Sequence, residues 1–156
     1  MKKKIAEIKE VTYGAEGIIF KFSKEEIENA IRKKDFEKRS FQGDLNGLNN
    51  EWNKGARDPG EYAERQRISH IKIIANFVNE NWREPILLCS DGNTILDGGH
   101  RHLAAKHSGK EEIDVIVTDA PVDITDAQKK KLWAAITKYK DLEKALSEAG
   151  IQILKK

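Results

Sequence analysis

The chain is poor in the residues that would place it in a disulfide-bonded or membrane-bound class. It has one cysteine and three prolines in 156 residues, and a single cysteine excludes an internal disulfide. No apolar run approaches the ~20 residues of a membrane-spanning helix. The lysines at positions 2–4 lack the apolar segment that follows such a charge run in a secretory signal. These absences predict a cytoplasmic protein with no membrane partner.

A large excess of one charge is also lacking. The 28 basic and 26 acidic side chains leave a formal net charge of +2, so any nucleic-acid surface has to be local. Charged residues make up 35% of the chain and hydrophobic residues 38%, which indicates a globular protein with a heavily charged exterior. The length predicts a single domain over residues 1–156.

Residues 1–57 predict a hairpin, a helix and a loop. Alternating apolar positions in Ile5–Val11 and Gly17–Phe22 predict a β-hairpin. Ser23–Glu26 has the S-x-x-E pattern of a capping box, which predicts the start of a helix. The following segment, from Gln42 to Gly60, has little periodicity, and a loop of that length is usually functional or mobile.

Basic residues gather where this loop ends. They are Lys54, Arg57, Arg65 and Arg67. Two interpretations stay open: a solvated surface, or a segment that covers a phosphate site or meets a nucleic-acid backbone. Trp52 either stacks on a base or packs the loop down.

The middle of the chain predicts a helix followed by strands. Apolar spacing predicts a helix over Glu61–Asn81, with His70 at the edge of its buried stripe and without a role. Ile86–Cys89 and Thr94–Leu96 predict two strands joined by a tight turn, and Cys89 is expected to be a small buried residue. Val115–Val117 predicts a strand at or near the centre of the sheet.

The C-terminal region predicts a long helix. Thr125–Gln128 is a second capping box, and the helix it starts runs to Ala149 with Gly150 as its stop. Such a helix either kinks near Lys138 or projects its apolar stripe onto a second subunit, which would form a homodimer. The segment from residue 126 to residue 156 has eight lysines against four acidic residues, either to contact a phosphate backbone or to solubilise the helix. Residues 151–154 predict a short strand.

The candidate site lies between the second strand and the next helix, at Asp97-Gly98-Gly99-His100-Arg101-His102. Gly98 and Gly99 can adopt positive φ and let a ligand approach the backbone. The first amides of the helix lack intrahelical partners, and the helix dipole adds positive charge, so this position favours phosphate. Arg101 adds a guanidinium that can grip phosphate with two hydrogen bonds.

Asp97, His100 and His102 are the groups that could carry chemistry here. Asp97 is either the N-cap of the helix, or a group that orients a hydroxyl, or a general base, or a ligand of Mg²⁺ held with nucleotide phosphates. Histidines such as His100 and His102 can titrate near neutral pH, and His100 is the candidate donor or acid–base group. His100 and His102 point to different sides of a helix, so with His107 they do not predict a protein-bound zinc.

The string from Leu96 to Ala105 resembles the "DGxHR…AA" signature of the ParB/sulfiredoxin superfamily. The preceding helix, Ile68–Asn81, runs into Pro85-Ile86-Leu87-Leu88 and is similar to the family's helix followed by a "PI" strand. The resemblance covers residues 58–118. It implies an α/β (α+β) fold with a small mixed sheet flanked by helices. Residues 1–57 would add the hairpin, helix and loop, and residues 119–156 the helical extension.

Departures from the family narrow the function. The catalytic cysteine of sulfiredoxins is missing from the motif, and Cys89 lies one strand too early. CTP-dependent partition proteins carry a glutamate where Gly99 and His100 stand here, and their downstream "ENxQR" helix is not found. The free-serine kinases resemble this chain best at Asp97–Arg101, and Glu61 is one candidate for their second acidic residue.

The sequence therefore predicts a nucleotide- or phosphate-binding ParB-like domain that acts with DNA, as a binding factor or a nuclease. Its catalytic candidates are Asp97 and His100, and its phosphate-binding candidates are Gly98, Gly99, His100, Arg101 and His102. The expected ligand is ATP, ADP or CTP, with or without Mg²⁺. Two alternatives stay open: a small-molecule phosphotransferase similar to free-serine kinases, and a non-catalytic interaction module.

Overall fold

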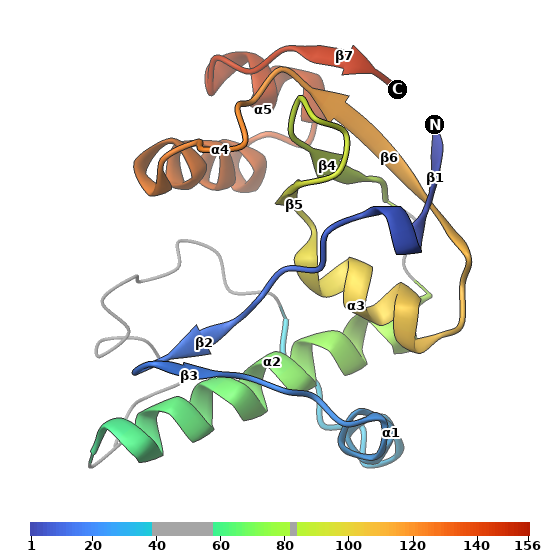
Figure 1. Ribbon diagram of the computed structural model, residues 1–156, viewed down its shortest axis with the longest axis vertical. Coiled ribbons are helices and arrows are strands. Elements are labelled where there is room, and N and C mark those ends of the chain that lie inside the picture. The colour runs from blue at the N-terminus through green and yellow to red at the C-terminus, as the bar shows by residue number, and fades with distance from the viewer. Residues whose placement is uncertain (39–57, 82–83) are drawn as a thin grey trace. The chain divides into compact units, whose positions relative to one another are not determined.

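The computed structural model describes residues 1–38, 58–81 and 84–156, and Figure 1 shows its elements. In chain order they are β1 (Lys2–Lys4), the 3-10 turn η1 (Ile5–Glu7), β2 (Gly14–Ala15), β3 (Ile18–Ile19), α1 (Lys24–Arg32), α2 (Pro59–Glu80), β4 (Ile86–Leu88), β5 (Ile95–Asp97), α3 (Gly99–His107), β6 (Glu112–Thr118), α4 (Asp126–Lys138), α5 (Leu142–Glu148) and β7 (Ile153–Lys155). Helices combined with a mixed sheet confirm the predicted α/β class.

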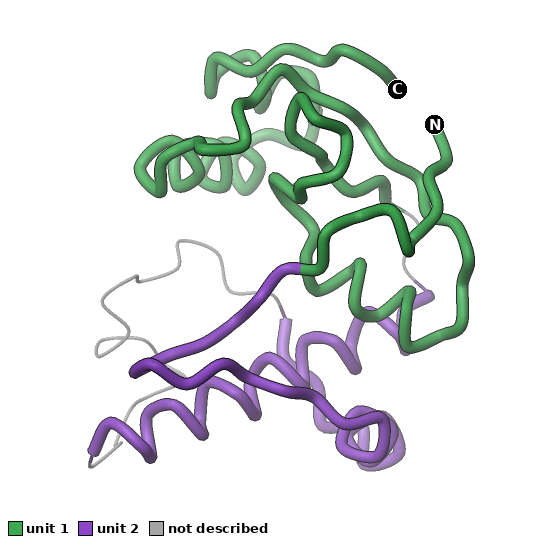
Figure 2. The backbone as a smooth tube through the Cα atoms, viewed as in Figure 1, with its two compact units in different colours: residues 1–10, 83–156 green, residues 11–82 purple. Residues whose placement is uncertain are grey.

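The chain divides into two compact units, coloured separately in Figure 2. Unit 1 comprises Met1–Glu10 and Arg83–Lys156, and unit 2 comprises Val11–Trp82. The predicted ParB-like region, residues 58–118, therefore contributes α2 to unit 2 and its strands and α3 to unit 1.

Unit 1 is built on a mixed sheet with the order β1-β6-β4-β5, in which β7 also pairs with β6. β4 and β6 are parallel, with Ile86 opposite Val115, whereas β4 and β5 form an antiparallel hairpin. Val115 is fully buried, because β6 has partners on both sides. The expected central position of this strand is confirmed.

The core of unit 1 joins the sheet to α4 and α5. Leu87, Cys89 and Leu96 from the hairpin pack with Leu132 of α4 and Leu146 of α5. Burial raises the pKa of the Cys89 thiol, which suits a packing residue. The apolar stripe of the C-terminal region therefore covers the core of its own unit, and a homodimer through it stays a prediction.

The prediction of one continuous C-terminal helix is wrong, and the alternative prediction of a break near Lys138 is confirmed. α4 ends at Lys138, and Tyr139 is extended with φ −108° and ψ 134°. Asp141 then caps α5 by accepting a hydrogen bond from the amide of Glu143 at 3.0 Å. Two helices joined by a short connection bring two apolar stripes onto one core, which a straight helix of that length could not do. Gly150 follows α5 with φ +74°, as expected of a C-terminal stop.

The predicted N-terminal hairpin is misplaced. Ile5–Val11 contains no named strand: Ile5 and Ile8 are both buried by the 3-10 turn η1, in which residues three apart lie on one side. The strand lies earlier, at β1, which pairs with β6. A hairpin does form from β2 and β3, around Glu16 and Gly17, whose φ values are both positive as in a type I′ turn.

Unit 2 contains α1, α2 and the β2–β3 hairpin. The capping box that starts α1 is confirmed, since the Ser23 hydroxyl accepts from the amide of Glu26 at 3.1 Å. α2 begins at Pro59, two residues before the predicted start, because Asp58 caps it. Although α2 has 22 residues, no helix within the described ranges is long and apolar enough to cross a membrane.

His70 lies inside unit 2 and not at the edge of the α2 stripe, so that expectation is wrong. The side chain is 8% exposed. Its ring lies 4.5 Å from that of Tyr13 and 5.8 Å from that of Phe20, centroid to centroid. Burial lowers the pKa of His70 to about 4, so the imidazole is neutral in the folded protein at physiological pH.

This buried imidazole makes unit 2 sensitive to mild acid. Because the pKa of His70 is about 4 when folded and about 6.5 when unfolded, the unfolded chain binds an extra proton between these values. Above pH 6.5 this difference in proton binding has little effect on the free energy of unfolding. Below it, that free energy falls as the pH drops, by roughly 2 kcal/mol between pH 7 and pH 5. Urea unfolding of wild type and His70→Phe at both pH values measures this contribution. An equal acid loss in the two proteins would contradict it.

Candidate functional site

The candidate site is the turn between β5 and α3, and the β4–β5 hairpin positions it. The Asp91 carboxylate closes the hairpin by accepting hydrogen bonds from the amides of Asn93 and Thr94, both at 2.9 Å, and from the Thr94 hydroxyl at 2.7 Å. The Asn93 amide and the Thr94 groups hold the pKa of Asp91 below its usual value. Asp97 ends β5, so this local turn fixes where the motif begins.

Gly98 is the pivot of the site. Its φ of 111° and ψ of 25° make it the N-cap of α3. A Cβ at this position would lie 2.6 Å from the Cγ2 of Ile86, so only glycine fits. Gly99 is different, because it is the first residue of α3 and is not among the residues with positive φ. The expectation of a glycine-specific turn is therefore right for Gly98 and wrong for Gly99.

Asp97 and Arg101 form a buried ion pair. Nη2 of Arg101 lies 2.8 Å from Oδ2 of Asp97, and Nη1 donates to the Pro85 carbonyl at 3.0 Å. Asp97 is 5% exposed and Arg101 6%. Asp97 is thus a partner of Arg101 and not the N-cap. These contacts tie the start of α3 to the chain entering β4, and a role for either side chain toward phosphate or metal stays a prediction.

The amino end of α3 carries little negative charge. Gly98 has no side chain with which to cap the helix, and the first turn has no acidic residue. The negative charge of the nearby Asp97 is balanced by Arg101 at 2.8 Å. Gly98 and Gly99 are buried, whereas His100 is half-buried. A ligand at this end of α3 would therefore meet His100 first.

His102 belongs to a different side of the motif. Its Nε2 lies 3.2 Å from the Ile5 carbonyl, and because a carbonyl can only accept, Nε2 carries the proton. The side chain is 2% exposed, and burial lowers its pKa. It lines a pocket of about 550 Å³ that Ile5, Ile8 and Lys106 also line. His102 thus anchors η1 to α3, and its predicted contact with phosphate stays untested.

No cluster of three or more histidine, cysteine, aspartate or glutamate side chains that could hold a metal occurs in the described part of the chain. His107 is the last residue of α3, at the opposite end from His100. Mg²⁺ bound together with a nucleotide stays a prediction that rests on Asp97.

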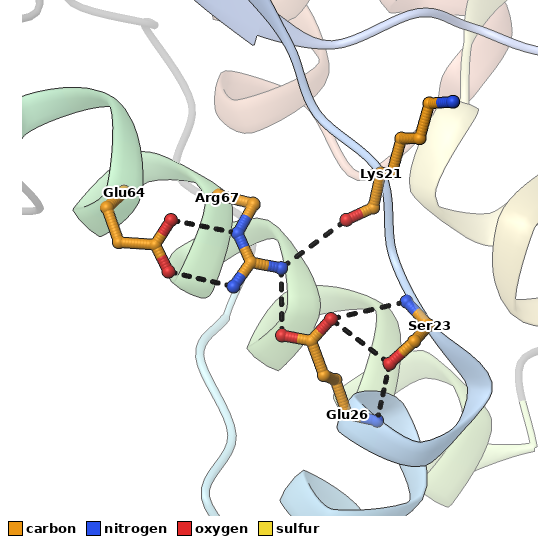
Figure 3. Close-up of polar contacts among 5 residues, drawn as sticks. All are labelled: Lys21, Ser23, Glu26, Glu64 and Arg67. Carbon is orange, nitrogen blue, oxygen red and sulfur yellow. Dashed lines mark hydrogen bonds and ion pairs between the residues drawn. The ribbon is translucent and has the colours of Figure 1, made fainter. Parts of the chain in front are cut away.

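Two of the four basic residues predicted near the loop are engaged within unit 2. Arg65 pairs with Glu61 at 2.9 Å. Arg67 binds Glu26 and Glu64, each at 2.8 Å, and its Nη1 also contacts the Lys21 carbonyl at 3.4 Å (Figure 3). This network ties the capped start of α1 to α2. Trp52, Lys54 and Arg57 lie outside the described residues.

Sequence reasoning missed two residues that shape the site. The Pro85 carbonyl receives Arg101, and Ile86 fills the space beside Gly98. The signal in the sequence is the "PI" pair, in which Pro85 precedes β4 and Ile86 begins it.

Comparison with known proteins identifies no relative of this chain. No family model matches the chain, and neither a curated protein nor a solved structure does. The resemblance to the ParB/sulfiredoxin superfamily therefore remains a hypothesis carried by the motif itself.

Proposed function

We propose that the amino end of α3 binds a phosphate group, and that the ligand is a nucleotide or DNA, as expected of a ParB-like domain. The main support is the turn at Gly98, where the chain leaves β5 with φ 111° and enters α3 without a capping side chain. Helix amino ends of this kind attract anions through their amides and through the helix dipole.

The surrounding charges support the same ligand. Pairing with Arg101 at 2.8 Å cancels the charge of Asp97, which would otherwise repel phosphate. The absence of an acidic residue from the first turn of α3 removes the usual internal competitor for the dipole. His100, half-buried on that turn, can donate a hydrogen bond to a phosphate oxygen.

In this proposal the motif residues have separate tasks. Gly98 makes the turn, the first amides and His100 contact the phosphate, and the Asp97–Arg101 pair holds the turn on β4. Arg101 acts through its contacts with Asp97 and Pro85 and thereby positions the amides.

Exchanging His100 for glutamate tests the site. A carboxylate in the first turn of a helix is favourable to the helix itself, but it lies where the anion would bind. We expect calorimetric titration with ATP, ADP or CTP, with and without Mg²⁺, to show binding to wild type. His100→Glu should weaken that binding about tenfold or more, since a nearby like charge costs roughly 1–4 kcal/mol.

His107→Glu is the matched control. It makes the same chemical change on the same helix, at the last residue instead of the second, so its effect on affinity should be less than about threefold. Equal losses of nucleotide affinity in the two variants would show that the net charge of the protein, and not the position of the carboxylate, determines the affinity. If wild type binds neither DNA nor any of the three nucleotides, the proposal fails and a non-catalytic interaction module is favoured.

A further inference from the structure

Positive charge is concentrated in the C-terminal segment, although the whole chain is nearly neutral. The segment from Asp126 to the end contains eight lysines and four acidic residues, against a net charge of +2 for the entire protein. The remainder of the chain is therefore slightly acidic. An uneven distribution of this kind produces a local field that attracts polyanions.

The acidic residues of this segment either lie at the starts of its helices or pair with two of its own lysines. Asp126 lies in the first turn of α4, and Asp141 caps α5. Glu143 pairs with Lys156, and Glu148 lies 4.0 Å from Lys138. By contrast, none of Lys130, Lys131 and Lys144 forms an ion pair with a residue in the described ranges.

Three of the lysines are exposed along α4. They are Lys130, Lys131 and Lys138, whereas Leu132 and Ala135 of the same helix are buried. Eight residues separate Lys130 from Lys138, which places them about 12 Å apart along the helix axis. The charges are thus spread along a surface and do not converge on one point.

Tyr139 joins the charges of α4 to those of α5. Nζ of Lys138 lies 5.1 Å and Nζ of Lys144 lies 4.9 Å from the centroid of the Tyr139 ring. Both ammonium groups are attracted to the ring. They are therefore kept no more than about 10 Å from each other, and they repel. An anion bound near both ammonium groups would offset that repulsion.

We propose that Lys130, Lys131, Lys138 and Lys144, the lysine surface, bind the phosphodiester backbone of a nucleic acid. Exposed charges that are spread along a surface fit the repeated phosphates of a strand better than they fit a single small anion. Lys138 can exchange its partner Glu148 for phosphate at little cost, because their side chains are 66% and 44% exposed and exposed pairs contribute little. This surface is separate from the amino end of α3 and does not depend on what that end binds.

Salt-dependent binding of a 20-nucleotide single-stranded DNA tests the lysine surface. Fluorescence anisotropy is measured between 50 and 200 mM salt for wild type and for the triple variant Lys130→Gln/Lys131→Gln/Lys144→Gln. Each lost phosphate contact should reduce the slope of log K against log salt by about 0.7. We therefore expect the slope to fall by roughly 2 and the affinity at 100 mM salt to fall at least about tenfold.

The control removes the same charge elsewhere. Lys2→Gln/Lys24→Gln/Lys106→Gln removes three exposed lysines that pair with Asp114, Glu28 and Glu10, and it should change the affinity less than about threefold. An equal loss in both triple variants, or no salt-dependent binding by wild type, would overturn the proposal. So would binding to phosphatidylserine vesicles without binding to DNA.

The lysine triple variant separates this inference from the proposed function. It should bind the three nucleotides as wild type does, even though it has lost most of its affinity for the DNA strand. If His100→Glu loses DNA binding and the lysine triple variant keeps it, the nucleic acid binds at α3 and the lysine surface is excluded.

Discussion

Replacing Arg101 by methionine should destabilise unit 1 by about 3–5 kcal/mol, the usual cost of removing one partner of a buried ion pair. Methionine keeps an unbranched side chain but leaves the Asp97 carboxylate, which is 5% exposed, without the guanidinium 2.8 Å away. The Pro85 carbonyl also loses the hydrogen bond from Nη1. Hydrogen exchange of the β4, β5 and α3 amides measures this effect, because it reports on unit 1 separately from unit 2.

The double variant Asp97→Asn/Arg101→Met identifies the cause. Asparagine removes the uncompensated charge, so the double variant should be more stable than Arg101→Met alone by at least about 1 kcal/mol, although it has one further substitution. Asp97→Asn by itself should be milder than Arg101→Met, because the guanidinium keeps the Pro85 carbonyl as an acceptor. Equal protection of the α3 amides in wild type and Arg101→Met would show that the ion pair does not hold the turn.

The features that were predictable from the sequence are those decided by neighbouring residues. Ser23 and Thr125 each bond to a residue three positions later, and both capping boxes are present. The β4–β5 hairpin forms around Asp91, whose acceptor contacts are all within three residues. The turn at Gly98 was predicted for the same reason: a strand followed by two glycines and a helix pattern leaves few backbone conformations.

The features that were not predictable depend on residues far apart in the chain. β1 pairs with β6 across more than 100 residues, as Lys2 lies opposite Asp114. The sequence of β1 is three lysines, which lack the alternation of apolar and polar residues that predicts a strand. His70 is buried by Tyr13 and Phe20, which precede it by about 50 residues. The apolar pattern of α2, the helix that contains His70, does not indicate where these two aromatic rings lie.

At the site itself, residue types predicted an anion-binding turn but not the contacts of its charged groups. Asp97 and Arg101 are four residues apart, a spacing that permits an ion pair. Because Asp97 precedes the helix, capping was an equally good interpretation. The choice depends on Pro85, whose carbonyl binds the other arm of the guanidinium and so turns Arg101 toward β4. Only the folded arrangement of β4 beside β5 supplies that acceptor.

Gly98→Ala should be the other strongly destabilising change, by about 2–5 kcal/mol. A non-glycine residue held at positive φ costs roughly 1–2 kcal/mol, and φ is 111° here. The added Cβ would also lie 2.6 Å from Cγ2 and 2.9 Å from Cβ of Ile86, and overpacking of this kind costs about 1–3 kcal/mol. The expected measurement is again loss of hydrogen-exchange protection in β4, β5 and α3. Nucleotide binding should be lost with it if the turn presents the amides.

Gly109→Ala separates the two contributions to this effect. Gly109 has φ +74°, but a Cβ there would meet nothing within 4 Å, so the variant should lose only the conformational part, about 1–2 kcal/mol. In Gly98→Ala/Ile86→Ala, removal of Cγ2 relieves the closest contact, and the double variant should be at least about 1 kcal/mol more stable than the sum of the single effects predicts. Strict additivity would mean that Cγ2 of Ile86 does not restrict position 98.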